Sequence, residues 1–319
     1  MKKLLFAICA VAALASCSKE EVVSYDKGEA IGFANPFVNK ATRADYSTNN
    51  VNAFKVYGAV TPTGGALEQI YNGVEVTRGN KNYGDAWTYD EQYIQYWQPN
   101  SEYEFAAIVD GEAASLTSHL PKTIKFTVAD GNENKDLLYA TASVITNDTA
   151  TPSGNGYANN CVAFNFTHLL SKMQFTIENA TNQTYKVTDI SVTRFTDKGV
   201  YEIADDGSNG TWAEDTDAAY NVELTFGETA KIEGGDNDIA TETRQFLPLE
   251  QTLAVTITYD VYQNDTVIGQ LTKTGTIPAT TYEKNKLYNV VATLTGNDIK
   301  FTVSSVGGWT PSTPDINVQ

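Results

Sequence analysis

The chain has 319 residues and a formal net charge of −17 at pH 7, from 22 Lys and Arg against 39 Asp and Glu. This acidic balance argues against nucleic acid and anionic lipid headgroups as partners, because both carry charge of the same sign. A hydrophobic content of 41% predicts a folded chain, and the length suits about two domains. Tyr (18) and Phe (13) are plentiful whereas Met (2) and His (2) are scarce, which favours an all-β fold class.

The N-terminus has the pattern of a secretory signal. Lys2 and Lys3 precede an apolar run over residues 4–13, which is too short to span a bilayer. The Leu-Ala-Ser sequence before Cys17 resembles a bacterial lipobox. We therefore predict a signal peptide over residues 1–16 and lipidation of Cys17, since several acyl chains on one residue give a stable anchor. The alternative is an ordinary signal peptide that contains a cysteine. Loss of residues 1–16 leaves 20 Lys and Arg against 39 Asp and Glu, a net charge of −19.

Residues 18–21, Ser-Lys-Glu-Glu, resemble the surface-export tag of bacterial lipoproteins. No Asp follows Cys17, so the usual signal for retention at the inner membrane is absent. Together these features predict attachment to the outer membrane, at the cell surface, through the lipid anchor. The alternative is that residues 18–21 are a solvated tether.

A first strand is predicted over residues 28–37, where Ile31 and Phe33 alternate with small residues. Pro36 ends this strand, because proline cannot donate to a sheet ladder. The polar residues 40–45 that follow predict an exposed connector, which is the usual place for proteolytic nicking.

Alternation of apolar and polar residues recurs later in the chain. Residues 253–261 and 267–271 flank a Gln-Asn-Asp turn and predict a hairpin. Residues 290–294 and 299–303 repeat the pattern. Short strands separated by Gly, Asn and Asp turns favour β-sandwiches.

Two local features interrupt this regularity. The pair Tyr185 and Val187 is out of phase with Ile190 and Val192, which predicts a bulge. Helical turns are compatible only with residues 168–172 and short stretches near Asp136.

The Pro-, Gly- and Asn-rich stretch 149–160 is the best candidate for a linker. A boundary after residue 165 then divides the rest of the chain into similar halves. The predicted organisation is a signal peptide (1–16), a lipidated N-terminal segment (17–43), an N-terminal β-sandwich (44–165) and a C-terminal β-sandwich with a tail (166–319).

Catalytic residue types are sparse, and we predict that the chain is not an enzyme and holds no cofactor or metal. His119 and His168 are the only histidines, which excludes a site made of several histidines. Cys161 precedes an alternating apolar strand and is expected to be a small core residue with no disulfide, because Cys9 leaves with the signal and Cys17 is acylated. No nucleophile elbow, phosphate-binding loop or CxxC occurs. A glycosidase that uses two carboxylates stays open as an alternative.

An aromatic cluster lies in the first half of the chain. Its members are Trp87, Tyr89, Tyr93, Tyr96, Trp97, Tyr103 and Phe105. We predict that these side chains form a sandwich core, with Tyr93 on a strand paired with the strand of Tyr103 and Phe105. The alternative is an exposed platform that stacks on sugar rings.

Six stretches, in this order, resemble the fimbrillin family of Bacteroidetes surface pili. They are Ala-Phe-Lys-Val-Tyr-Gly (53–58), Tyr-Trp-Gln-Pro (96–99) with Tyr-Glu-Phe-Ala-Ala (103–107), Asp-Leu-Leu-Tyr-Ala (136–140), Phe-Asn-Phe-Thr-His-Leu-Leu-Ser-Lys-Met (164–173), Asn-Lys-Leu-Tyr (285–288) and the late Trp309. The resemblance covers nearly the whole chain after the signal.

The resemblance implies two tandem β-sandwich domains of transthyretin-like type and an assembly route. A lipoprotein subunit is cut by an Arg-specific protease that removes the first strand, here the strand of Ile31 and Phe33. A neighbouring subunit's C-terminal tail then fills the groove as a donor strand. In this chain Ile316 and Val318 alternate as a donor strand requires, with a frayed terminus as the alternative.

The cleavage site that we predict lies between Arg43 and Ala44. The other arginines are Arg78, Arg194 and Arg244, and all four follow a Thr. Arg43 is distinguished by its place after the first strand. Arg194 falls within a strand pattern and is expected to be shielded, whereas Arg78 is a possible exposed competitor.

Two Thr residues, Thr149 and Thr266, lie at predicted turns in short Asp-Thr-aliphatic motifs that resemble O-glycosylation sites. Taken together, the sequence predicts a structural subunit of a surface fimbria that supports adhesion, with a shaft position favoured. Its predicted partners are other copies of itself, other fimbrial subunits and the Arg-specific protease. A tip or anchor subunit and a surface glycan-binding lipoprotein are the alternatives.

Overall fold

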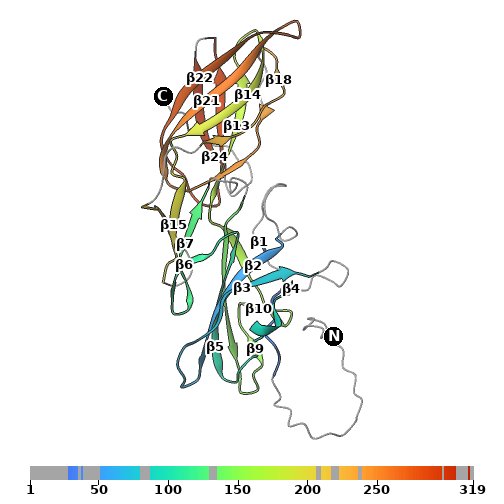
Figure 1. The fold of residues 1–319 in the computed structure, drawn as a ribbon, viewed down its shortest axis with the longest axis vertical. Helices are drawn as coiled ribbons and strands as arrows, with labels where there is room; N and C mark the ends of the chain where they lie inside the picture. The colour runs from blue at the N-terminus through green and yellow to red at the C-terminus, as the bar shows by residue number, and fades with distance from the viewer. Residues whose placement is uncertain are drawn as a thin grey trace.

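The computed structural model describes residues 28–34, 37–38, 51–79, 87–128, 135–205, 210–216, 223–235, 239–296, 298–306 and 315–316. Strands dominate these ranges, and the predicted all-β fold class is confirmed (Figure 1). Residues 168–172 and Asp136, which the sequence left compatible with helical turns, are not helical, because His168 ends one strand, Lys172 lies in the next and Asp136 lies outside any helix. A short 3-10 turn, η2 (Glu91–Tyr93), forms elsewhere. Within the described ranges, no helix is long and apolar enough to cross a membrane.

The N-terminal sheet has eight strands. In spatial order they are β1 (Phe37–Val38), β12 (Asn165–His168), β8 (Leu138–Thr146), β5 (Ser101–Val109), β2 (Ala53–Pro62), β3 (Glu68–Arg78) and β4 (Trp87–Thr88), with β9 (Pro152–Ser153) on β8. A ribbon of β10 (Tyr157–Ala158) and β11 (Cys161–Val162) is separate. All pairs in the sheet are antiparallel except β1 with β12.

One face of the N-terminal sheet covers a core that we call the aromatic core. Its large rings are Phe33, Phe54, Tyr71, Trp87, Trp97, Tyr103, Phe105, Phe164 and Phe166. Most of these residues lie at alternate positions of the strands, where a period-2 sequence pattern places them on one side. Phe33, Trp97 and Phe164 come from segments outside the strands. The predicted core role of Trp87, Trp97, Tyr103 and Phe105 is confirmed.

A four-stranded sheet covers the opposite face. Its order is β16 (Thr211–Glu214), β15 (Lys198–Glu202), β7 (Leu120–Thr127) and β6 (Ala113–Thr117). The Ala113 N–H donates to the Tyr57 hydroxyl of β2 at 3.0 Å, and Ile124 and Phe126 of β7 pack in the same core as Tyr57. Because β7 pairs with β15, this sheet joins residues from both sides of position 165. The predicted domain boundaries stay a prediction.

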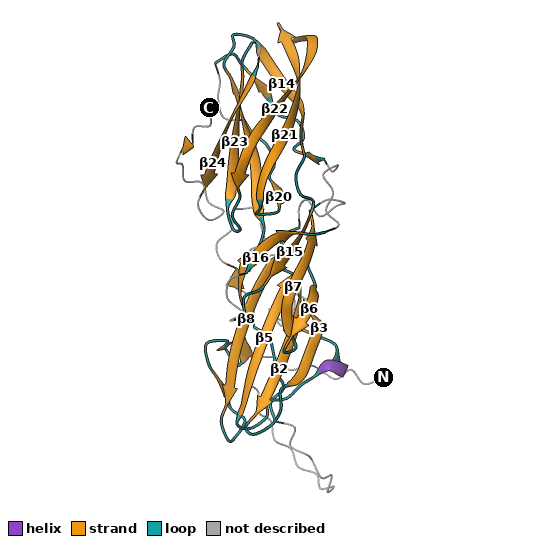
Figure 2. Ribbon diagram, turned by 90° about the vertical axis from the view of Figure 1, so that its left-hand side faces the viewer, coloured by secondary structure: helices purple, strands orange, loops and turns teal. Residues whose placement is uncertain are grey.

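The C-terminal part consists of two facing sheets (Figure 2). One has the order β19 (Ile239–Ala240), β13 (Ser171–Asn179), β23 (Leu287–Leu294), β24 (Ile299–Val306) and β25 (Asp315–Ile316), with β20 (Arg244–Phe246) on β13. The other has the order β17 (Leu224–Thr225), β14 (Thr184–Thr193), β21 (Glu250–Gln263) and β22 (Thr266–Thr281), with β18 (Lys231–Ile232) on β14.

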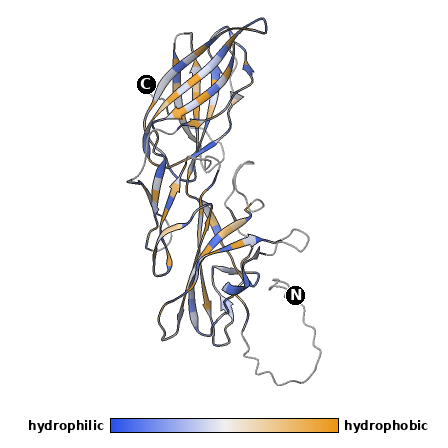
Figure 3. Ribbon diagram, viewed as in Figure 1, coloured by the Kyte–Doolittle hydropathy of each residue, from blue (hydrophilic) through white to orange (hydrophobic). Residues whose placement is uncertain are grey.

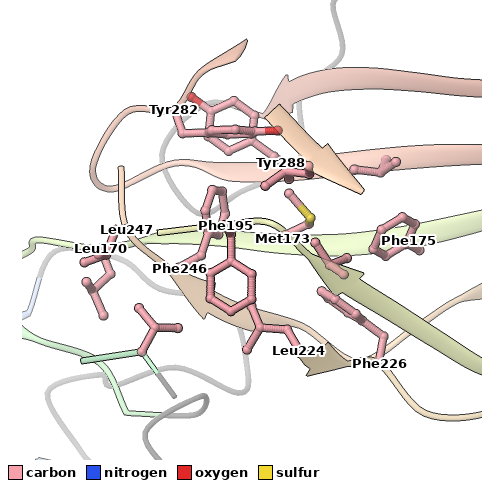
Figure 4. Packing of buried hydrophobic residues seen from close by; sticks show 14 of the residues in the cluster. Leu170, Met173, Phe175, Phe195, Leu224, Phe226, Phe246, Leu247, Tyr282 and Tyr288 are labelled. Atoms are coloured by element: carbon pink, nitrogen blue, oxygen red, sulfur yellow. The ribbon is translucent and has the colours of Figure 1, made fainter. Parts of the chain in front are cut away.

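The predicted hairpin is formed by β21 and β22, which turn at residues 264–265. The inward residues of β21 alternate with outward ones, and Figure 3 shows the same alternation of hydropathy along these strands. The predicted bulge is confirmed, since the register of β14 on β21 shifts between Val187 and Asp189. Rings such as Phe175, Phe226 and Phe246 fill the space between the sheets (Figure 4).

Candidate functional site

The segment 28–34, which we call the inserted segment, is hydrogen-bonded on both sides by other parts of the chain. The Ile31 N–H donates to the Gln95 carbonyl at 2.8 Å, and the Trp97 N–H donates to the Glu29 carbonyl at 3.1 Å. On the other side, the Val162 N–H donates to the Gly32 carbonyl and the Ala34 N–H donates to the Val162 carbonyl, both at 2.8 Å. The segment therefore lies as a strand-like insertion between residues 95–97 and the end of β11.

The two alternating side chains of the inserted segment point into the aromatic core. Ile31 is 1% exposed and Phe33 is 3% exposed. The ring of Phe33 contacts five other rings at centroid distances between 5.6 and 6.4 Å, namely those of Phe54, Tyr71, Tyr89, Phe105 and Phe164. Phe33 is therefore a central member of this core. The predicted strand over residues 28–37 is wrong in its bounds, because Ala30 and Phe33 form isolated bridges and a separate strand, β1, begins at Phe37.

Tyr89 holds the inserted segment from the side. Its hydroxyl donates to the Ile31 carbonyl at 2.6 Å and lies 3.3 Å from the Tyr71 hydroxyl. Burial raises the pKa of both phenols above the ordinary value. Tyr89 thus stays neutral and acts as a donor to the inserted segment over the physiological pH range.

Loss of the inserted segment would leave a defined groove. The Gln95 carbonyl, the Trp97 N–H and both backbone groups of Val162 would lose their partners, and the rings around Phe33 would lose their cover. A strand that enters this groove must supply backbone groups on both edges and two apolar side chains at positions i and i+2. Farther along the chain, β1 runs parallel to β12 with Phe37 opposite Asn165.

The C-terminal tail pairs with its own sheet in this structure. Ile316 of β25 lies opposite Val303 of β24, and Asp315 lies opposite Ser304, in antiparallel register. Val318, the other predicted donor residue, lies outside the described residues. The described part of the tail is therefore extended, as a donor strand must be.

The lipidation and cleavage residues, Cys17, Arg43 and Ala44, lie outside the described residues.

The expectation that Arg194 is shielded is wrong, because Arg194 follows the end of β14 with a φ of 60° and an exposed side chain. Arg78 is half-buried, with its guanidinium 5.7 Å from the centre of the Trp87 ring. Arg244 forms an ion pair with Glu242 at 2.9 Å.

Both candidate glycosylation residues are exposed at turns. Thr149 lies in the turn after β8, where its hydroxyl and its N–H both donate to the Asn147 side-chain oxygen at 2.8 and 3.0 Å. Thr266 follows the turn of the β21–β22 hairpin. Their modification stays a prediction.

Tyr93 is where the prediction for the aromatic cluster fails. It lies in the 3-10 turn η2 (Glu91–Tyr93) and is 43% exposed, so it does not lie on a strand. Asp90 caps this turn by accepting from the Gln92 N–H at 3.1 Å. An Asp that precedes a short polar run is a local capping signal that would have revealed the turn.

Sequence reasoning also missed a buried pair of titratable residues. His168 and Asp136 are almost fully buried, and the His168 Nδ1 lies 2.6 Å from the Asp136 Oδ2. Burial raises the pKa of Asp136. These residues belong to two of the family-like stretches, and pairing of β8 with β12 brings them together.

Cys161 is buried, as expected for a core residue, but the prediction that it forms no disulfide is wrong for the chain in this structure. Cys161 is disulfide-bonded in this structure. A chain that has lost Cys9 with residues 1–16, and whose Cys17 is acylated, keeps Cys161 as its one free cysteine.

The chain is similar in sequence to a known protein family. A family model described as fimbrillin-like matches residues 42–309. No curated protein sequence is significantly similar to the chain.

Solved structures show the same fold. A fimbrial protein from Bacteroides vulgatus has a TM-score of 0.59 and 20% identity, over 88% of this chain and 99% of that chain. A protein assigned to cell adhesion from Bacteroides ovatus has a TM-score of 0.55 and 15% identity, over 87% of this chain and 96% of that chain. Another from Bacteroides uniformis has a TM-score of 0.52 and 17% identity, over 88% and 99%.

Proposed function

Because the chain belongs to the fimbrillin-like family, we propose that it is a structural subunit of a cell-surface fimbria that supports adhesion. It is exported as a lipoprotein through Cys17, activated by Arg-specific cleavage and polymerised by donor-strand exchange. A shaft position is favoured because the sequence has both an Arg site after a removable strand and an alternating tail.

The observation that carries this proposal is the way in which the inserted segment is built into the aromatic core. The backbone of residues 29–34 is bonded on both sides, and Ile31 and Phe33 are buried at positions i and i+2. Ile316 and Val318 have the same i, i+2 spacing. A tail from a neighbouring subunit therefore offers the two kinds of contact that the groove needs, backbone hydrogen bonds and alternating apolar side chains.

The proposed activation step is hydrolysis of one peptide bond. Water adds across the bond between Arg43 and Ala44, which leaves a carboxylate on Arg43 and a new amino terminus on Ala44. This cut separates the inserted segment and the lipid anchor from the rest of the chain, because both precede residue 44 in the sequence. In the lipidated chain, Cys9 has left with the signal peptide and the Cys17 sulfur carries the lipid, so neither cysteine ties the N-terminal segment to Cys161. The inserted segment is then held only by noncovalent contacts and is free to leave.

The energetics favour exchange over an empty groove. Burial of each apolar side chain contributes about 1.5–3 kcal/mol, and each unpaired buried backbone group costs about 1–3 kcal/mol. An empty groove would also expose strand edges that aggregate. Because a donor strand restores both contributions, the cleaved subunit gains stability when it binds the tail of another copy.

Two other readings differ in what they require. A tip or anchor subunit has the same fold but does not both donate and accept a strand. A glycan-binding lipoprotein that uses the tryptophans of the aromatic cluster as a platform is disfavoured, because Trp87 and Trp97 are 6% and 3% exposed.

Removal of the tail tests the donor role. A chain without residues 311–319 should be cleaved normally but should stay as separate subunits, whereas the full-length chain forms polymer. Replacement of Ile316 and Val318 by Asp should have the same effect, with replacement of Ser312 and Asn317 by Asp as the matched control. Unchanged polymer from the truncated chain would refute the donor-strand proposal.

A further inference from the structure

A second candidate site lies at the open edge of β3, beside the turn η2. The two elements enclose a groove of about 560 Å³ that is open to solvent. Asn72 and Glu75 come from β3, and Tyr89, Asp90, Gln92 and Tyr93 come from the segment around η2. Within the described residues, β4 pairs only with residues 77–78 of β3, so the edge of β3 along the groove has no strand partner.

Tyr93 provides an apolar surface at a fixed position in this groove. Its side chain is 43% exposed, although its backbone is held in the turn by donation of the Tyr93 N–H to the Asp90 carbonyl at 3.0 Å. The following N–H, that of Ile94, donates to the Glu91 carbonyl at 3.2 Å. A rigid, half-exposed aromatic ring offers a flat face that packs against the C–H groups of a sugar ring at little entropic cost.

The groove also holds polar groups that are already oriented. Asp90 accepts from the Gln92 backbone N–H and from its side-chain Nε2, both at 3.1 Å. These bonds fix the Gln92 amide and leave its oxygen and second N–H to face a ligand. Across the groove, Asn72 and Glu75 are exposed on β3. Amides and carboxylates at set positions suit ligands with several hydroxyl groups.

A bulge in β3 shapes the wall of the groove. Tyr57 lies opposite Asn72 and Val56 lies opposite Val74, so Gly73 is the extra residue, with a φ of 69°. A Cβ at Gly73 would lie 3.3 Å from the Tyr57 hydroxyl oxygen. Bulges of this kind redirect neighbouring side chains and are frequent beside binding sites.

Charge narrows the class of ligand. None of the described residues that line the groove is Lys or Arg, whereas Glu75 and Asp90 are acidic. The whole chain carries a net charge of −17. Carboxylated or sulfated sugars would therefore be repelled, and neutral hydroxyl-rich ligands are favoured.

From these features we propose that the groove between β3 and η2 binds a neutral saccharide, with Tyr93 stacked on the sugar ring and Gln92 hydrogen-bonded to its hydroxyl groups. The inner wall includes Tyr89, whose hydroxyl donates to the Ile31 carbonyl. The groove is thus lined by a residue that also contacts the inserted segment. The inference deepens the proposed adhesive function and relies on it only for the biological role of the binding.

The test uses the full-length subunit and saturation-transfer NMR with lactose, mannose and N-acetylglucosamine as neutral probes, and 3′-sialyllactose as the anionic probe. At least one neutral probe should bind more tightly than the anionic one. Tyr93→Ala should weaken that binding about tenfold or more, and Tyr93→Phe should keep it, because the ring and not the hydroxyl makes the contact. Gln92→Ala should also weaken it. Leu116→Ala, at another exposed apolar residue, is the control and should have no effect.

Three results would overturn the proposal: no neutral probe binds at millimolar concentration, 3′-sialyllactose binds best, or Tyr93→Ala binds like the original chain. Circular dichroism checks that each variant is folded, which is expected because Tyr93 is exposed. Filament formation is measured on the same variants. Tyr93→Ala should assemble normally, so a failed saccharide site and a failed fimbrial function are distinguishable.

Discussion

The rings of Phe33 and Phe164 lie stacked at a centroid distance of 6.0 Å, with an interplanar angle of 14°. Phe33 belongs to the inserted segment, whereas Phe164 lies about halfway along the chain. The contact joins a segment proposed to be lost on activation to the centre of the aromatic core. A chain that loses Phe33 must therefore refill that position.

Phe33→Ala should destabilise the uncleaved subunit by about 3–5 kcal/mol, because it removes a fully buried ring and leaves a cavity among five other rings. Denaturant unfolding measures this change. Ile145→Ala is the control, since Ile145 is 56% exposed and its loss should change stability by about 0.5 kcal/mol or less. Equal unfolding midpoints for the two variants would contradict a core role for the inserted segment.

Tyr89→Phe should loosen the inserted segment without creating a cavity. The variant keeps the ring but removes the hydroxyl that donates to the Ile31 carbonyl at 2.6 Å, at a cost of about 0.5–1.5 kcal/mol. Hydrogen exchange at the Ile31 amide should become faster. The comparison variant is Tyr96→Phe, which removes the hydroxyl of the tyrosine that directly follows Gln95 in the sequence. Protection of Ile31 that does not change in Tyr89→Phe would count against the clamp.

Lys172 should make stability depend on pH. Burial lowers the pKa of Lys172 from its ordinary value of 10.5 to about 7. Between these values the folded chain binds fewer protons than the unfolded chain, so the free energy of unfolding should rise as pH increases from about 7 to about 10.5. Lys172→Met should remove this contribution and reduce the slope.

The change in the free energy of unfolding with pH is best compared between pH 7 and pH 9. Thermal unfolding of the Lys172→Met variant and of the original chain measures it. Above about pH 10, buried tyrosines such as Tyr139 oppose the effect, because burial raises their pKa in the folded state. Lys273→Met is a control on the less buried strand β22. An identical slope in Lys172→Met and the original chain would show that Lys172 is not desolvated.

Gly58→Ala should cost about 1–3 kcal/mol through overpacking. A Cβ at Gly58 would lie 2.9 Å from Phe105 Cδ1 and 3.0 Å from Tyr71 Cδ2, inside the aromatic core. Gly269→Ala is the matched control, because a Cβ there meets nothing within 4 Å. Thermal unfolding should separate the two variants clearly, and similar values would mean that the core tolerates the added methyl group.

Local patterns in the sequence were enough to predict the fold class, the β21–β22 hairpin and the bulge in β14. In each case the pattern of period 2 directly reports which face of a strand is buried. The burial of Ile31 and Phe33 followed from the same pattern. These features need no knowledge of distant partners.

Features that depend on distant pairing were not predictable. The pairing of β7 with β15 builds the sheet that covers the face of the N-terminal sheet opposite the aromatic core. It joins residues far apart in the sequence, and no local pattern reports it. The contact of Asp136 with His168 likewise depends on pairing of β8 with β12. Arg194 was misjudged because it lies one residue past the end of β14, in a backbone conformation with positive φ that a strand pattern does not reveal.

The most direct measurement of the assembly proposal is Arg-specific proteolysis of the purified subunit, followed by electron microscopy and N-terminal sequencing of the product. Arg43→Ala is compared with Arg194→Ala, which removes the exposed alternative site. The original chain and Arg194→Ala should form filaments whose subunits begin at Ala44, and Arg43→Ala should form none. Filaments from Arg43→Ala, or assembled subunits that still contain residues 28–34 in the same chain, would contradict activation by removal of the inserted segment.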